Sequence, residues 1–193
     1  MLVLGIDPGT ATTGYGVVRS TGPGMASLVE CGVIRTKARD PLPQRLHEIH
    51  AGVRELITRH RPDVLAVEDV FYSKNVRTTV VLGHARGVIL LAGAESGLEV
   101  HEFPPAEIKK AVAGTGAATK EQVQFMLTRL LRLKAVPQPS DAADGVAAAL
   151  TYAMSAGVPR LPRTRGLPAA SAGVGSARQA PPNPFIRKGA SER

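Results

Sequence analysis

The sequence predicts an α/β fold in which a mixed five-stranded sheet carries helices on both faces. Two short, continuously apolar runs at residues 2–7 and 63–68 each end on a carboxylate, Asp7 and Glu68. Such runs are typical of strands buried on both faces. Between them, residues 43–60 repeat apolar side chains at helical spacing. A strand that is reached through a helix returns parallel to the first, so these two strands are expected to be parallel neighbours.

The first strand is expected at the centre of the sheet. Pro8-Gly9 ends it, because proline has no N–H for the ladder and glycine tolerates positive φ. Strand alternation places Asp7 on the same face as Val3 and Gly5. Asp7 therefore lies at a rim of the sheet, where a buried carboxylate is costly unless it has a partner.

The other elements follow from turns and apolar spacing. Residues 13–19 and 27–36 predict two more strands that form antiparallel hairpins with the first. Residues 75–94 predict a helix that is apolar around much of its circumference and is therefore central or covered by a partner subunit. Residues 98–103 predict the fifth strand. Three helices follow, one after Pro104-Pro105, one opened by a Thr119–Gln122 capping box, and an Ala-rich one capped by Ser140. This order is the arrangement of a ribonuclease H-like domain.

Composition predicts one folded domain. The chain has 193 residues, of which 44% are hydrophobic, enough for a substantial core. No segment approaches the ~20 apolar residues of a membrane span, and no basic region precedes the first apolar run, so neither a membrane segment nor a signal peptide is expected. The single cysteine, Cys31, excludes an internal disulfide framework and favours a reducing, cytoplasmic location.

The positive charge is concentrated at the end of the chain. Of the net charge of +8, residues 159–193 carry +6, from seven basic side chains against Glu192. The same stretch holds six prolines and four glycines, a composition that cannot bury a core. We therefore predict a ribonuclease H-like domain at residues 1–158 and a basic, Pro/Gly-rich disordered tail at 159–193. The tail is either a soluble extension or a non-specific arm for polyanions.

Two further carboxylates open the last helix. Asp141 and Asp144 are three residues apart, so they share one face of the first turn. By itself this pair is typical of a solvated helix start. However, residues 145–150 are apolar and must pack on the sheet, which aims the first turn along the sheet toward a rim. The sequence thus predicts that Asp7 and Glu68 meet Asp141 and Asp144.

A cluster of four carboxylates predicts a metal site. The acids repel each other unless cations lie among them, and oxygen ligands without His or Cys suit Mg²⁺ or Mn²⁺. Two such ions activate a water and stabilise the leaving oxygen of an in-line displacement at phosphorus. Lys109 and Lys120 are placed by this hypothesis beside the developing negative charge.

Distinctive segments are spread over residues 2–152: Gly5-Ile6-Asp7-Pro8-Gly9, Thr13-Gly14-Tyr15-Gly16, Val67-Glu68 with Phe71 and Lys74-Asn75, Gly83-His84-Ala85-Arg86-Gly87, Gly114-Thr115-Gly116 and Asp141-Ala142-Ala143-Asp144. In these segments the sequence resembles the RuvC family, the bacterial Holliday junction resolvases. The resemblance implies a homodimer of ribonuclease H-like subunits that makes paired, metal-dependent nicks in four-way DNA junctions during recombination and repair. It also implies cooperation with the RuvA–RuvB branch-migration complex.

The resemblance assigns roles to individual residues. Asp7, Glu68, Asp141 and Asp144 match the family's catalytic carboxylates, Lys109 and Lys120 its two functional lysines, and Phe71 the aromatic that acts on bases near the crossover. The sequence departs from the usual pattern at Gly145, where the family usually has Ala, and at Tyr152, where His is frequent.

The neighbours of Phe71 are suited to DNA. Lys74, Asn75 and Arg77 lie close after it, and an aromatic with basic side chains offers unpaired bases a stacking face and phosphates a counter-charge. The simpler explanation is a loop aromatic packed on the core, followed by ordinary residues of a helix start.

Three other functions compete with this one. The Gly-Ile-Asp-x-Gly-Thr turn at residues 5–10 also opens actin-like ATPases and sugar kinases. Those proteins usually need two such domains, and an ATPase gives no reason for Asp141 and Asp144 together, so no nucleotide cofactor is expected. A non-catalytic junction-binding protein would be expected to lose one of the four acids. A related nuclease acting on another branched or RNA-containing substrate would keep them all.

Overall fold

A computed structural model describes residues 1–22, 24–69 and 76–155. These residues form a single sheet in the order β3-β2-β1-β4-β5. The first strand is antiparallel to the second, whereas β1, β4 and β5 run parallel to one another. The elements are β1 (Leu2–Asp7), β2 (Thr12–Gly22), β3 (Met25–Arg35), α1 (Leu42–His60), β4 (Val64–Glu68), α2 (Val76–Glu95), β5 (Glu99–Phe103), α3 (Pro105–Ala113), α4 (Lys120–Leu130) and α5 (Ser140–Ser155).

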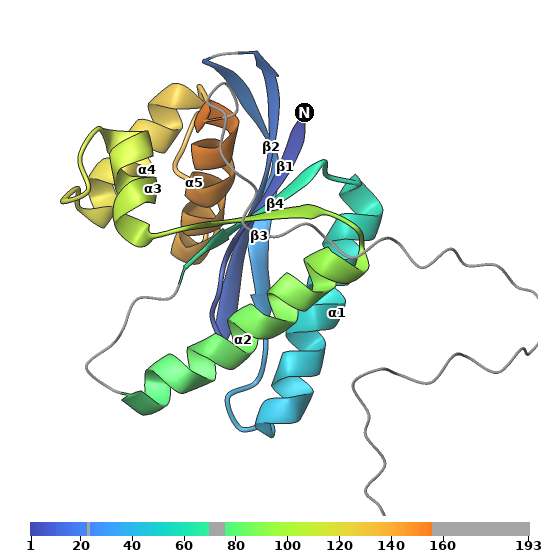
Figure 1. The fold of residues 1–193 in the computed structure, drawn as a ribbon. Helices are drawn as coiled ribbons and strands as arrows, with labels where there is room; N and C mark the ends of the chain where they lie inside the picture. The colour runs from blue at the N-terminus through green and yellow to red at the C-terminus, as the bar shows by residue number, and fades with distance from the viewer. Residues whose placement is uncertain (23, 70–75, 156–193) are drawn as a thin grey trace, which may run out of the picture.

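Helices cover both faces of the sheet, as predicted (Figure 1). On one face, α5 lies against the strands with α3 and α4 outside it, and this core contains Val3 and Phe103. On the other face, α1 and α2 pack on Leu4 and Ile6. Because alternate residues of β1 enter the two cores, the four middle residues of the strand, 3–6, are buried at the centre of the molecule. The predicted mixed α/β sheet is thus confirmed.

The register of β1 explains why two carboxylates meet. β1 and β4 pair in parallel, and Ile6 lies opposite Val67. The next residue of each strand is the carboxylate, Asp7 or Glu68. Both strands therefore deliver an acid to the same rim of the sheet.

Glycines let α5 approach the sheet backbone directly. A Cβ atom on Gly145 would come within 2.6 Å of the Cα of Tyr15, and one on Gly16 within 2.5 Å of the Cα of Val146. A Cβ on Gly5 would meet the carbonyl oxygen of Gly145 at 2.2 Å. Separations this short leave no room for a side chain, so these glycines fix the depth at which α5 lies on β1 and β2.

Local signals placed most helix ends correctly. Thr119 and Gln122 form the predicted capping box, each side chain accepting a hydrogen bond from the backbone N–H of the other residue. Gly114, in the left-handed region at φ 81°, ends α3. The last helix begins one residue earlier than predicted, at Ser140, whose hydroxyl accepts a hydrogen bond from Gln124 of α4 at 3.4 Å.

The hairpin of β2 and β3 is longer than the sequence pattern indicated, and each strand has 11 residues.

Within the described parts of the chain, no helix has the length and apolarity to cross a membrane. The predicted boundary at residue 158 and the tail at 159–193 lie outside the described residues.

Candidate active site

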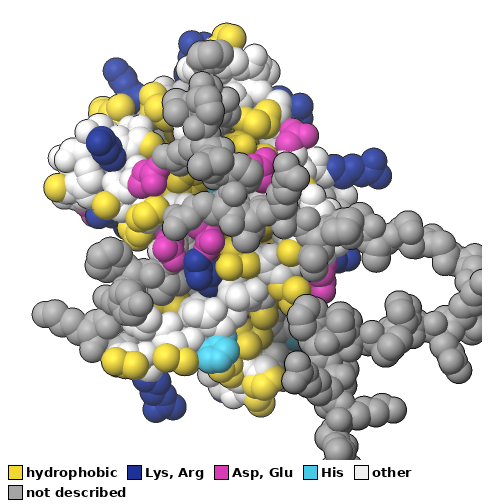
Figure 2. Space-filling view, viewed as in Figure 1, with side chains coloured by type: hydrophobic (Ala, Val, Ile, Leu, Met, Phe, Trp, Pro, Cys, Tyr) yellow, Lys and Arg dark blue, Asp and Glu magenta, His cyan; other side chains and the backbone are white. Residues whose placement is uncertain are grey.

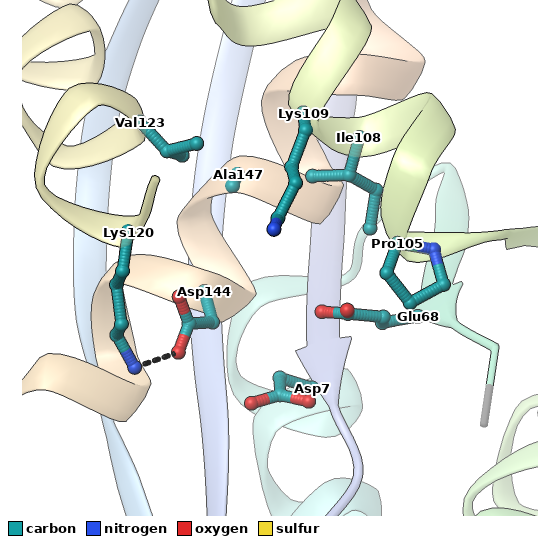
Figure 3. Close-up of a pocket in the computed structure, with 9 residues that line it drawn as sticks. All are labelled: Asp7, Glu68, Pro105, Ile108, Lys109, Lys120, Val123, Asp144 and Ala147. Carbon is teal, nitrogen blue, oxygen red and sulfur yellow. Dashed lines mark hydrogen bonds and ion pairs between the residues drawn. The ribbon is translucent and has the colours of Figure 1, made fainter. Parts of the chain in front are cut away.

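The carboxyl ends of β1 and β4 open into a pocket of about 220 Å³ beside the first turn of α5. Asp7, Glu68 and Asp144 line it together with two lysines: Lys109 of α3 extends into the pocket, and Lys120 of α4 lies beside Asp144 (Figure 3). Five elements that are distant in the sequence therefore contribute charged groups to one open cavity.

Three of the predicted acids form a tight group. Asp7, Asp141 and Asp144 each offer one carboxylate oxygen, and these oxygens all lie within 4.8 Å of one another. Glu68 extends into the same pocket on the other side of Asp7, toward Lys109 (Figure 3). Asp7 thus lies between Glu68 and the acidic pair of α5.

The surroundings make the two strand carboxylates difficult to ionise. Burial, followed by the charges of Asp144 and Asp141, raises the pKa of Asp7 to about 7. Burial and then the charges of Asp7 and Asp144 raise the pKa of Glu68 to about 8. The nearby lysines only partly oppose these effects. Because a nearby positive charge favours the ionised form of an acid, these carboxylates would be stabilised by bound cations.

Lys120 is the closest positive charge to the acidic group. Its Nζ donates a hydrogen bond to the Asp144 carboxylate at 2.6 Å. Although burial opposes the charged amine, this bond and the neighbouring acids raise the pKa of Lys120. Burial raises the pKa of Asp144 in spite of the same hydrogen bond. The ammonium group therefore stays charged and holds one oxygen of Asp144 in place.

Comparison with known proteins agrees with this arrangement. The family model described as crossover junction endodeoxyribonuclease RuvC matches residues 3–152. The chain belongs to the RuvC family. The enzyme of that name from Pelotomaculum thermopropionicum is 50% identical over 153 residues, which are 79% of this chain and 93% of the relative. The one from Moorella thermoacetica is 51% identical over 154 residues, covering 79% and 91%.

Solved structures show the same fold. Thermus thermophilus RuvC in complex with a Holliday junction substrate superposes with a TM-score of 0.77 at 40% identity, covering 81% of this chain and 94% of that one. The yeast mitochondrial Holliday junction resolvase Ydc2 gives a TM-score of 0.57 at 12% identity over 79% and 78% of the two chains. The second likeness concerns the fold alone. Together the matches confirm the ribonuclease H-like architecture expected of a RuvC-family chain.

The predicted DNA-contacting residues are mostly beyond what the structure describes. Phe71, Lys74 and Asn75 fall in residues 70–75, outside the described residues. Arg77 is described and lies exposed in the first turn of α2. Asp69, the residue after Glu68, forms an ion pair with Arg86 of α2.

The site of this RuvC-family chain also has an apolar wall that was not predicted from the sequence. Pro105, Ile108, Val123 and Ala147 line the pocket together with the charged residues. Their side chains exclude water and help to raise the pKa of the acids. A helical-spacing signal existed only in α4, where Val123 follows Lys120 by three residues, but spacing does not show which neighbours share a pocket.

Proposed function

We propose that this RuvC-family chain is a structure-selective endonuclease that resolves four-way (Holliday) DNA junctions by paired phosphodiester hydrolysis in recombination and repair. The observation that carries the proposal is the meeting of Asp7, Glu68, Asp141 and Asp144 at one rim of the sheet. Relatives at about half identity are named crossover junction endodeoxyribonucleases. A solved relative is described in complex with a Holliday junction.

The acidic residues fit divalent cations. Their donor set within the described residues is all oxygen, and three of the ligand atoms lie within 4.8 Å of one another. Burial and then neighbouring carboxylates raise the pKa of Asp7 and Glu68, and a bound cation would favour their ionised forms. Hard oxygen ligands suit Mg²⁺, or Mn²⁺. We assign two ions to the site, which Asp7, Glu68, Asp141 and Asp144 would hold. When bound, they would supply an activated water and Lewis-acid stabilisation of the phosphate.

The protein's own residues then position the substrate and oppose its charge. Lys120, kept charged by Asp144, and Lys109, whose amine points into the pocket (Figure 3), are placed to stabilise negative charge that develops on the scissile phosphate. The apolar wall of Ile108 and Val123 limits water on that side of the pocket, which strengthens each of these electrostatic interactions.

Substrate choice is assigned to the segment that follows Glu68. Phe71 would stack on an unpaired base near the crossover, while Lys74, Asn75 and Arg77 would bind neighbouring phosphates. The two kinds of residue would have different roles. Phosphate contacts position the nucleic acid, whereas an aromatic side chain stacks on a base that has left the base stack.

The active form is proposed to be a cytoplasmic homodimer that works with the RuvA–RuvB complex. The free end of α2 presents hydrophobic side chains to solvent, visible at the lower left of Figure 2. Val76 is 75% exposed and Val80 is 52% exposed. Exposed apolar groups on one helix favour a covering subunit, and a pair of subunits would place two sites on one junction.

The decisive experiment separates binding from cutting. Asp7→Asn keeps the size of the side chain but removes a metal ligand, so the variant should bind a synthetic four-way junction and fail to cut it in Mg²⁺. Glu55→Gln is the control, since Glu55 is a 74% exposed carboxylate of α1. Products should be mapped at nucleotide resolution beside linear duplex and RNA–DNA hybrid substrates. Normal cleavage by Asp7→Asn, or faster cleavage of the hybrid than of the junction, contradicts the proposal.

A further inference from the structure

Arg86 of α2 bridges two carboxylates outside the candidate active site. Its Nη2 lies 3.2 Å from Oδ1 of Asp69, and the same nitrogen donates a hydrogen bond to the carboxylate of Glu102 in β5. The Arg86 side chain is only 27% exposed. Its Nε is buried and has no hydrogen-bond partner among the residues that the structure describes. A partly buried guanidinium with an unpaired Nε is costly to hold, which indicates a role beyond a surface ion pair.

Both partners of Arg86 lie beside the end of β4 that carries Glu68. Asp69 directly follows Glu68, and its backbone N–H donates a hydrogen bond to the carbonyl of Phe103 at 2.8 Å. Glu102 is the neighbour of Phe103 and pairs with Val67. The bridge from Arg86 therefore ties α2 to the last residues of β4 and β5.

Arg86 also lies where α2 meets the core. The first buried residue of the helix is Ala85, and none of residues 76–84 is buried. Those residues form the part of α2 that extends past the sheet in Figure 1. Any movement of this part of the helix would be transmitted to the end of β4 through the guanidinium.

The bridge holds the carboxylate that points away from the pocket. Alternation along the strand sends Glu68 into the pocket and Asp69 to the other side, where Arg86 neutralises it. Without that partner, the carboxylate of Asp69 would be free to turn toward the rim. The end of β4 would lose one of the contacts that hold it in place, and the carboxylate of Glu68 would be less well positioned.

We infer that Arg86 is a positioning residue, which acts through Asp69 and Glu102 to hold the Glu68 carboxylate at the metal site. This inference rests on the proposed function, because it concerns the metal-binding role of Glu68. Replacing a residue that does not bind the metal but orients a metal ligand typically lowers metal affinity or activity by about 10–100-fold.

The test compares two arginines that each anchor α2. Arg86→Met removes the bridge, and Arg86→Lys retains the charge. Arg54→Met is the matched control, because Arg54 of α1 lies 3.2 Å from Glu95 at the other end of α2. Mn²⁺ affinity of the free protein is measured by calorimetry, and the single-turnover rate on a saturating four-way junction is measured as a function of Mg²⁺.

We expect Arg86→Met to bind Mn²⁺ about tenfold more weakly and to require about tenfold more Mg²⁺ for half-maximal cleavage. Arg86→Lys should recover part of the loss, and Arg54→Met should match the wild type in both measurements. If Arg86→Met fails to fold, Asp69→Asn decides the question, since it removes the ion pair with little change of volume and should weaken Mn²⁺ binding in the same direction.

Wild-type Mn²⁺ affinity in Arg86→Met, or in Asp69→Asn where the first variant does not fold, overturns the inference. An equal loss in Arg54→Met also overturns it, because the effect would then be one of general stability. Failure of the proposed function is seen separately, as normal junction cleavage by Asp7→Asn. An inactive Asp7→Asn beside a normal Arg86→Met rejects only the positioning role.

Discussion

Asp7 and Glu68 are acids placed where the folded chain alone does not favour their ionised forms. Their pKa values rise to about 7 and about 8, chiefly because of burial and then because of neighbouring carboxylates. In the unfolded chain both groups would titrate near their ordinary values of 3.8 and 4.5. The difference links the stability of the protein to pH and to bound cations.

The sign of this linkage can be measured. In EDTA, the melting temperature should fall as pH rises from about 5 to about 8.5, because the folded state binds more protons than the unfolded state over that range. Mg²⁺ should raise the melting temperature more at pH 8.5 than at pH 5, because it binds the ionised acids of the folded state.

Asp7→Asn provides the control for this experiment. It removes one of the repelling charges, so in EDTA at pH 8.5 the variant should be more stable than the wild type while it gains less from Mg²⁺. Two results together would contradict the proposed repulsion among the acids. The metal-free stability of the wild type would increase between pH 5 and 8.5, and Asp7→Asn would be no more stable than the wild type at pH 8.5.

Among the elements, α5 has the tightest relation to the sheet. Its backbone touches that of β1 and β2 through Gly5, Gly16 and Gly145. The same helix supplies Asp141 and Asp144 from its first turn. The depth of this packing therefore sets the distance between the acids of α5 and Asp7.

Gly145→Ala should destabilise the protein although alanine is the better helix former. The added methyl would meet the backbone of Tyr15 at 2.6 Å, and overpacking of this kind costs about 1–3 kcal/mol. Urea unfolding measures the change in the free energy of unfolding. Gly22→Ala is the control, because its methyl would meet only the end of the Met25 side chain and should cost about 0.5 kcal/mol or less. Equal costs at the two positions would show that α5 is not seated on the backbone.

For the whole molecule, we propose that the exposed apolar end of α2 and the basic end of the chain determine how it binds its partners. The described helix leaves Val76 and Val80 uncovered, which we assign to the homodimer. Residues 159–193 add +6 to a domain that is nearly neutral, which favours a non-specific attraction to polyanions.

Val80→Glu should convert the dimer into a monomer, because a charge at an apolar interface is costly to bury. Light scattering should report half the wild-type mass, and junction cleavage should yield single instead of paired nicks. Val29→Glu is the matched control, since Val29 is 44% exposed on β3, and it should stay dimeric. A dimeric Val80→Glu with paired nicks would place the interface elsewhere.

A chain ending after residue 158 should bind the four-way junction more weakly at low salt than the full chain does. The salt dependence of its affinity should also be shallower, because fewer counterions are released on binding. Fluorescence anisotropy titrations at several salt concentrations measure both quantities. The single-turnover cleavage rate at saturating junction should be unchanged. If the affinity of both chains depended on salt concentration in the same way, the tail would be a soluble extension and not an arm that binds polyanions.

The order of the elements and the convergence of Asp7 and Glu68 could be predicted from local patterns in the chain. Apolar runs and helical spacing are local properties of the backbone, and a parallel pair of strands has only one rim at which its carboxyl ends can meet. The spacing of Asp141 and Asp144 likewise fixed their shared helix face. The fold and the acidic core of the site could therefore be predicted from residues 2–152.

How closely these parts approach one another depends on contacts between elements that are far apart in the chain. The contact of Gly145 with Tyr15, the apolar wall around the acids, and the bridge from Arg86 to Asp69 join elements that are distant in the chain. Periodicity shows which face of an element is buried but not which residue of another element it meets. The raised pKa values of Asp7 and Glu68 follow from that packing, because burial and charge separation are properties of the assembled site.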